Sequence, residues 1–156
     1  MPYIQQSEPE PGCLFCRVAH EDRDVDNLVV YRGELGLVML NRYPYNSGHV
    51  MVVPYQHTGD FAALHGEVAT AVMTLAQKTV TALRQALHSH GFNLGINQGE
   101  VSGAGIADHI HLHVVPRWNG DTNFMPVLAD VKVIPELLSA TAAKLRPVFA
   151  EVMQEQ

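Results

Sequence analysis

Three histidines alternate with apolar residues over the segment His109–Val115, which reads His-Ile-His-Leu-His-Val-Val. Side chains repeat every two residues along a β-strand, so this pattern predicts a strand with three imidazoles on one face and apolar side chains on the other. The chain has only 9 histidines among its 156 residues, so this segment is strongly enriched. Imidazole is suited to nucleophilic or acid–base chemistry near neutral pH. The segment is therefore the first candidate for a functional site.

Three interpretations of this cluster follow from its spacing. The first is ordinary packed or surface histidines, the usual interpretation of a single histidine on a strand. The second is one metal ion bound by all three rings, which is disfavoured because the outer two would lie about 13 Å apart on a strand, whereas zinc–nitrogen bonds are about 2 Å long. The third, which we favour, is a row of donors along a phosphate chain, with one ring attacking phosphorus while the others stabilise the developing charge.

The only two cysteines, Cys13 and Cys16, form a C-x-x-C pair. In a reducing compartment this spacing indicates a metal site or a redox pair more than a structural disulfide. Zinc is the favoured interpretation; an empty pair of thiols and a redox pair stay open, although the βαβ context of thioredoxin-like motifs is absent. Zinc would need two further ligands, and four protein ligands would make the site structural, not catalytic.

The rest of the pattern predicts the elements that position these residues. Short apolar runs predict strands, the first two forming a hairpin, over residues 28–31, 35–40, 49–53, 92–98 and 109–115. Helical spacing predicts one long amphipathic helix over 60–89 and a second that opens at Pro135 and is kinked or ended by Pro147. A turn or short helix is expected over 13–20 and irregular structure over 117–134. The order indicates an α+β domain on an antiparallel sheet.

Length and charge limit the classes of protein that fit. A chain of 156 residues suits a single domain, which we expect to span residues 13–156 after a loosely held arm of residues 1–12. The net charge is −6 and lysines and arginines do not cluster, so binding to nucleic acid or to an anionic membrane is not expected. There is no run near the roughly 20 apolar residues of a membrane span and no typical leader, so a cytoplasmic location is expected.

The triad segment resembles, at every position, the H-φ-H-φ-H-φ-φ signature of the histidine-triad (HIT) nucleotide-binding family, where φ is apolar. The stretch from Asn41 to His49 is similar to the ribose-and-phosphate loop of the fragile-histidine-triad branch. Gln98 stands where that branch has a glutamine near the bridging oxygen. Residues 43–46 and 116–121 look like a bacterial group related to diadenosine tetraphosphate phosphorylases.

This resemblance implies a role for each matching residue. His111, at the middle of the triad, would attack the α-phosphorus of a nucleotide and form a nucleotidyl-histidine intermediate. His113 and His49 would hold phosphate oxygens. Asn41 would contact the ribose, and Gln98 would contact the scissile bridging oxygen.

The resemblance also implies a HIT-like fold, with an antiparallel sheet of about five strands, one long helix and one C-terminal helix, paired as a homodimer. It adds His57 and His109 to Cys13 and Cys16 as the four ligands of a structural zinc. Residues 102–106, Ser-Gly-Ala-Gly-Ile, lack the polar side chain that some relatives place near the leaving group. The identity of the general acid is therefore left open.

The favoured function is cleavage at the α-phosphorus of a dinucleoside polyphosphate (diadenosine tetraphosphate or triphosphate) or a related nucleotide, by a hydrolase or a phosphorylase. Water and inorganic phosphate both stay open as the acceptor. One alternative is a nucleotide-binding sensor with slow or incidental catalysis. A further alternative is a zinc-dependent hydrolase.

Overall fold

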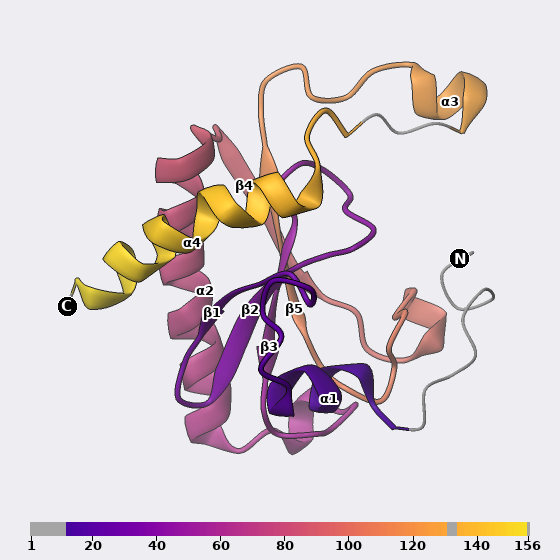
Figure 1. Ribbon diagram of the computed structural model, residues 1–156. Coiled ribbons are helices and arrows are strands. Elements are labelled where there is room, and N and C mark those ends of the chain that lie inside the picture. Colours follow the sequence, from indigo (N-terminus) through magenta and orange to yellow (C-terminus); the bar gives the residue numbers. More distant parts are fainter. Residues whose placement is uncertain (1–11, 131–133, 156) are drawn as a thin grey trace.

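The computed structural model describes residues 12–130 and 134–155 and contains one five-stranded antiparallel sheet (Figure 1). The strand order is β1-β2-β3-β5-β4, so β1 and β4 are the edge strands. The strands are β1 (Val29–Arg32), β2 (Gly36–Leu40), β3 (Val50–Pro54), β4 (Gly91–Ile96) and β5 (Leu112–Arg117). The predicted α+β class and antiparallel sheet are confirmed.

Two long helices, α2 (Gly66–Leu87) and α4 (Leu138–Gln154), pack against each other and cover one face of the sheet. Their apolar stripes meet the inward-facing valines and leucines of the strands, and this forms the larger core cluster. The predicted helix over 60–89 begins later than expected, because Asp60 caps a separate 3₁₀ turn at Phe61–Ala63. It ends when His88 adopts a left-handed conformation.

The opposite face of the sheet is covered by the short helix α1 (Leu14–His20), which confirms the turn or short helix predicted over 13–20. Phe15 and Val18 of α1 are buried against apolar residues of β1, β2 and β3. This second cluster also contains Met51, and Ile106 packs against it. The sheet thus lies between two apolar layers, and the smaller layer carries the cysteine pair.

The triad segment is only partly a strand. Strand β5 begins at Leu112, so the prediction of a strand starting at His109 is wrong for its first three residues. Antiparallel pairing to β3 runs only from Val52–Leu112 to Val50–Val114, because the chain before Leu112 follows the loop after β3, where Ile110 donates to the Thr58 carbonyl. Within β5 the predicted alternation of faces is confirmed, with Leu112 and Val114 in the larger core.

The C-terminal part differs from the prediction at two points. Helix α4 begins at Leu138, three residues after Pro135, and does not end at Pro147, which lies inside it. The predicted irregular region contains a further short helix, α3 (Met125–Ala129), which projects from the body of the molecule (Figure 1). The predicted arm of residues 1–12 lies outside the described residues except for Gly12. Within the described part of the chain, we find no helix with the length and apolarity to cross a membrane.

Candidate active site and metal centre

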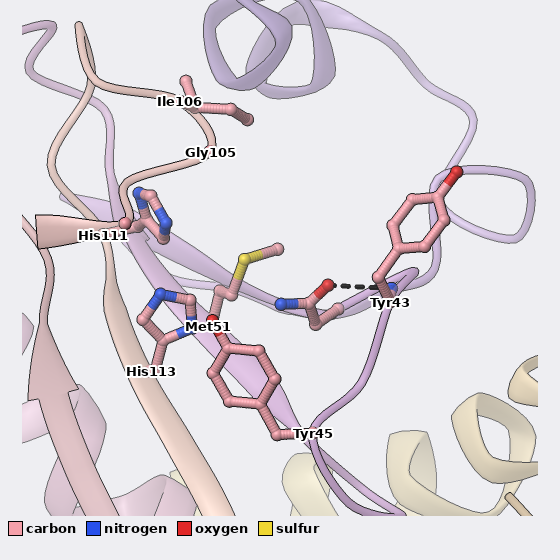
Figure 2. A pocket seen from close by; sticks show the side chains of 9 residues that line it. Tyr43, Tyr45, Met51, Gly105, Ile106, His111 and His113 are labelled. Carbon is pink, nitrogen blue, oxygen red and sulfur yellow. Dashed lines mark hydrogen bonds between the residues drawn. The ribbon is translucent and has the colours of Figure 1, made fainter. Parts of the chain in front are cut away.

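A pocket opens where the triad meets the loop between β2 and β3 and the glycine-rich segment before the triad (Figure 2). Its lining comprises Asn41, Tyr43, Tyr45, Met51, Gly103, Gly105, Ile106, His111 and His113. None of these side chains is a carboxylate, a lysine or an arginine, so the imidazoles are its most basic groups. The predicted residues His111, His113 and Asn41 are therefore brought together in one pocket.

The ring of His111 has a defined protonation pattern. Its Nδ1 lies 2.9 Å from the carbonyl oxygen of His109, which can only accept, so Nδ1 carries the proton. Burial lowers the pKa of His111, and the ring is therefore neutral near pH 7. The lone pair is then on Nε2. His111 thus presents an unprotonated nitrogen, as a nucleophile requires.

His113 is fixed by a chain of hydrogen bonds that runs through His49. The backbone N–H of Tyr45 donates to His49 Nδ1 at 3.0 Å, so the proton of neutral His49 is on Nε2. His49 Nε2 lies 2.9 Å from His113 Nδ1, which must accept, and the His113 proton is therefore on its Nε2. Burial, and then the neighbouring His111, lowers the pKa of His113 to about 4. His113 is thus a neutral donor at the pocket.

His49 and Gln98 lie differently from the other predicted residues. His49 is completely buried and stands behind His113, outside the set of lining residues. Gln98 is exposed just after β4, where its Oε1 accepts from the Phe61 backbone and its Nε2 donates to Asp60. The contacts of both residues with substrate stay predictions.

A network around Asp121 holds the loop of residues 41–48 against the end of β5. The Asp121 carboxylate accepts two bonds from Arg117, at 2.7 and 2.9 Å, and one from Asn46 Nδ2 at 2.8 Å. Arg117 also donates to Asn93 on β4. The guanidinium of Arg117 keeps the pKa of Asp121 well below its usual range. Sequence reasoning missed Asp121, which stands in the segment 116–121 without any local pattern that indicates its partner.

Sequence reasoning also gave no role to several lining residues. Tyr45 stacks against His113, with ring centroids 5.8 Å apart, and lies 4.6 Å from the ring of His49. Met51 and Ile106 connect the pocket to the layer beneath α1. The sequence pointed to Tyr45 only through its position inside the stretch from Asn41 to His49.

The four predicted metal ligands come together from three parts of the chain. Cys13 and Cys16 lie at the start of α1, His57 follows β3 and His109 precedes β5. Their ligand atoms all lie within 4.8 Å of one another. The Cys13–His109, Cys16–His57 and Cys16–His109 sulfur–nitrogen distances are 3.2, 3.3 and 3.7 Å, and the two Nδ1 atoms are 3.3 Å apart.

These distances fit a tetrahedral zinc site. Zinc–ligand bonds of about 2.0–2.3 Å separate neighbouring ligand atoms by roughly 3.3–3.8 Å. His109 Nε2 lies 2.9 Å from the Pro54 carbonyl and must donate to it, so the lone pair of His109 is on Nδ1, which faces the cysteines. The cysteines form no disulfide. Two thiols and two imidazoles form a closed donor set, which is typical of a structural zinc site.

Comparisons with known proteins identify the family. Residues 22–120 match the HIT domain family model. The AP-4-A phosphorylase of Mycobacterium tuberculosis is 42% identical over 127 residues, which cover 81% of this chain and 65% of that protein. An HIT-like protein of Methanocaldococcus jannaschii is 33% identical over 70% of this chain and 81% of its own length. This chain thus spans slightly less than two thirds of the mycobacterial relative.

Among solved structures, a Zn-bound histidine triad family protein from Mycobacterium smegmatis superimposes with a TM-score of 0.73 at 28% identity. The match covers 93% of this chain and 98% of that one. The family match includes the triad and the loop before β3, and the fold is shared with a solved member of the same family, so the chain belongs to the HIT domain family.

Proposed function

We propose that the chain is a nucleotide hydrolase or transferase that cleaves dinucleoside polyphosphates, such as diadenosine tetraphosphate, at the α-phosphorus through a nucleotidyl-His111 intermediate. The observation that carries this proposal is the protonation pattern of His111. Its Nδ1–H is bound to the His109 carbonyl, so the nitrogen with the lone pair, Nε2, is the one left for attack on a substrate in the pocket.

In the first step, the Nε2 lone pair of His111 forms a bond to the α-phosphorus. The bond from this phosphorus to the bridging oxygen breaks, and the leaving group departs with the electron pair. The ring becomes cationic, and its Nδ1–H bond to the His109 carbonyl stabilises that charge. The Nε2–H of His113 is the donor assigned to the phosphoryl oxygens, where negative charge develops.

In the second step, water or inorganic phosphate attacks the same phosphorus and releases a proton. The bond to His111 Nε2 breaks, its electron pair returns to the ring, and neutral His111 is restored. The similarity to an AP-4-A phosphorylase supports phosphate as one acceptor, since the matched region includes the triad and the loop before β3. Asn41, which lines the pocket, is assigned to the ribose.

The test is incubation with diadenosine tetraphosphate, with and without inorganic phosphate, followed by product analysis. ADP and ATP formed only with phosphate identify a phosphorylase, and AMP and ATP formed without it identify a hydrolase. His111→Asn should abolish turnover while nucleotide still binds, and the exposed His65→Asn serves as the matched control. Tight nucleotide binding without turnover by the unmodified protein would instead identify a sensor.

We also propose that Cys13, Cys16, His57 and His109 hold a structural zinc. The support is the spacing of their ligand atoms and the orientation of the His109 lone pair. A zinc held by four protein ligands joins the start of α1 to the sheet and takes no part in the phosphorus chemistry. Elemental analysis of the purified protein should give close to one zinc per chain, and the Cys13→Ser/Cys16→Ser variant should contain none.

We further propose that two copies pair along strand β4 as a homodimer. This strand is an edge of the sheet, and Leu94 on it is 48% exposed. An edge strand with an exposed apolar residue favours pairing with another strand. Light scattering after gel filtration should give twice the chain mass, and Leu94→Lys should shift the protein towards the monomer.

A further inference from the structure

Phe15 lies between the two cysteines in the sequence and between two triad histidines in space. Its ring is only 1% exposed. It meets the His109 ring edge-on, with centroids 5.3 Å apart and an interplanar angle of 72°. It also contacts the His111 ring, at 4.9 Å and 54°. One side chain of α1 therefore touches both a metal-ligand histidine and the histidine to which we assign the attack on phosphorus.

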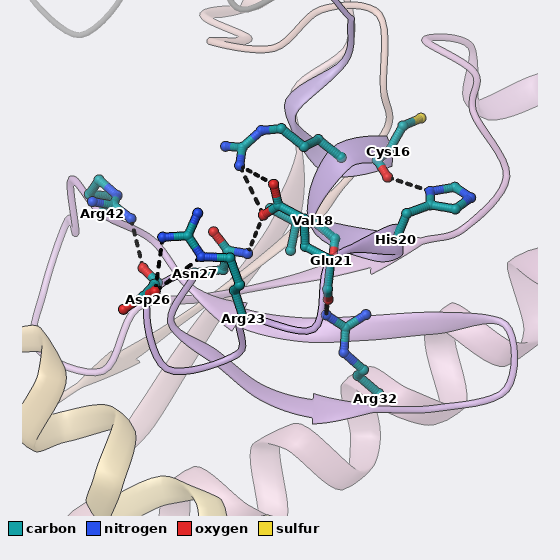
Figure 3. Close-up of polar contacts among 10 residues, drawn as sticks. Cys16, Val18, His20, Glu21, Arg23, Asp26, Asn27, Arg32 and Arg42 are labelled. Atoms are coloured by element: carbon teal, nitrogen blue, oxygen red, sulfur yellow. Dashed lines mark hydrogen bonds and ion pairs between the residues drawn. The ribbon is translucent and has the colours of Figure 1, made fainter.

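Helix α1 is held at both ends, by different means. At its start, Cys13 and Cys16 lie in the four-ligand cluster. At its end, the guanidinium of Arg32 on β1 donates to the carbonyls of Val18 and Glu21, both at 2.9 Å (Figure 3). It also donates to the carbonyl of Ala19 at 3.0 Å. Loss of a metal would therefore release the first turn of α1, which carries Phe15, while the last turn stays attached to the sheet.

The His111 ring depends on its neighbours for its orientation. The single bond from Nδ1 to the His109 carbonyl fixes one atom of the ring but permits tilting about that bond. The Phe15 ring packs against it at 4.9 Å, and the His113 ring meets it at 4.8 Å and 69°. Aromatic pairs in such tilted and edge-on arrangements are attractive and directional. Phe15 is thus a main constraint on the direction of the Nε2 lone pair.

We propose that Phe15 is a positioning residue for His111 and that it couples occupancy of the Cys13/Cys16/His57/His109 site to the orientation of the His111 ring. The coupling between the metal site and His111 follows two routes, and both begin at the bound metal. A metal fixes the His109 ring, and with it the backbone carbonyl that holds His111 Nδ1; it also fixes the turn of α1 that carries Phe15. The inference rests on the proposed role of His111 as nucleophile.

The test compares the unmodified chain with Phe15→Leu and with Val18→Ala. Val18 is the matched control because it lies on the same helix, is also 1% exposed, belongs to the same apolar cluster and has no ring. Each protein is titrated with zinc sulfate from the metal-free state to one equivalent. Nitrogen-15 NMR of the His111 imidazole, without any nucleotide, reports the Nδ1–H bond and the tautomer, and metal content is measured in parallel.

Phe15→Leu should retain zinc yet give broadened or shifted His111 signals, with kcat about tenfold lower and KM unchanged, as expected for a misaligned nucleophile. Val18→Ala should leave both the signals and kcat as they are. In the unmodified chain, the first equivalent of zinc should sharpen the His111 signals.

The proposal is overturned if Phe15→Leu leaves the His111 signals unchanged, or if Val18→Ala alters them equally. It is also overturned if zinc fails to bind or binds without affecting His111. Phe15→Met, which also removes the ring but keeps a large apolar side chain, replaces Phe15→Leu in these comparisons if that variant does not fold. Because the NMR measurement needs no substrate, it reports the effect of Phe15 and zinc on the His111 ring even without turnover, so failure of the proposed function and failure of this inference can be told apart.

Discussion

Substitutions of His49 distinguish a phosphate ligand from a residue that supports His113. His49 uses both ring nitrogens inside the protein, Nδ1 as acceptor from Tyr45 and Nε2 as donor to His113. Asparagine can place an oxygen where Nδ1 lies and so keep the Tyr45 bond while losing the His113 bond. Glutamine can place its NH₂ group where Nε2 lies and so keep the His113 bond while losing the Tyr45 bond.

Each variant leaves one buried polar group without its partner. An unsatisfied buried donor or acceptor costs about 1–3 kcal/mol of the free energy of unfolding. For a chain of this size, 1 kcal/mol corresponds to about 2–4 °C in Tm, so both variants should lose roughly 2–12 °C. His49 is completely buried and does not line the pocket, so water can do little to replace the lost hydrogen bond.

Activity should separate the two variants although their stabilities are similar. His49→Gln should keep most of kcat, because His113 still receives a hydrogen bond at Nδ1 and keeps its proton on Nε2. His49→Asn should lose about ten- to a hundredfold in kcat, since the His113 donor is no longer fixed. Urea unfolding, steady-state kinetics and NMR of the His113 tautomer measure these effects. Equal losses in kcat, or a rise in KM with an unchanged His113 tautomer, would show that His49 contacts phosphate directly.

Three further predictions concern pH, the pocket loop and the turn before β3. The pKa of His113 falls from its ordinary 6.5 to about 4 on folding, so the unfolded chain binds more protons between these pH values. The contribution of His113 to the free energy of unfolding, at most about 3 kcal/mol, is therefore complete above pH 6.5 and is lost as the pH falls towards 4. His113→Asn should flatten this part of the curve of stability against pH. Asp121→Asn should weaken the attachment of the loop of residues 41–48 and raise KM several-fold with little change in kcat. The control Asp22→Asn, at an exposed position, should change neither KM nor kcat. Gly48→Ala should cost about 1–3 kcal/mol in chemical denaturation, because φ is +74° and the new Cβ would lie 2.4 Å from a leucine side chain of α2; Gly66→Ala, with open space around it, should be neutral or stabilising.

Local patterns in the sequence were sufficient for much of the fold. Alternation and helical spacing predicted the five strands and two long helices, because each pattern reflects which side of a single element is buried. The same reasoning placed imidazoles opposite apolar residues in the triad. It failed where partners decide the outcome. Strand β5 begins at Leu112 because the chain before it bonds to the loop after β3, through Ile110 and the Thr58 carbonyl. Helix α4 passes through Pro147 and packs against α2 and β1.

The residue types and their spacing by themselves determined that histidines and cysteines are the candidate functional groups, since the three alternating histidines and the C-x-x-C pair can be read directly from the sequence. Only the tertiary structure decided what each group can do. His109 meets cysteines more than 90 positions away, His49 is enclosed behind His113, and Phe15 lies between two triad rings. The protonated nitrogen of each ring depends on a carbonyl or an N–H supplied by the fold. Sequence spacing carries no information about such contacts, because they are set by packing between elements that are far apart along the chain.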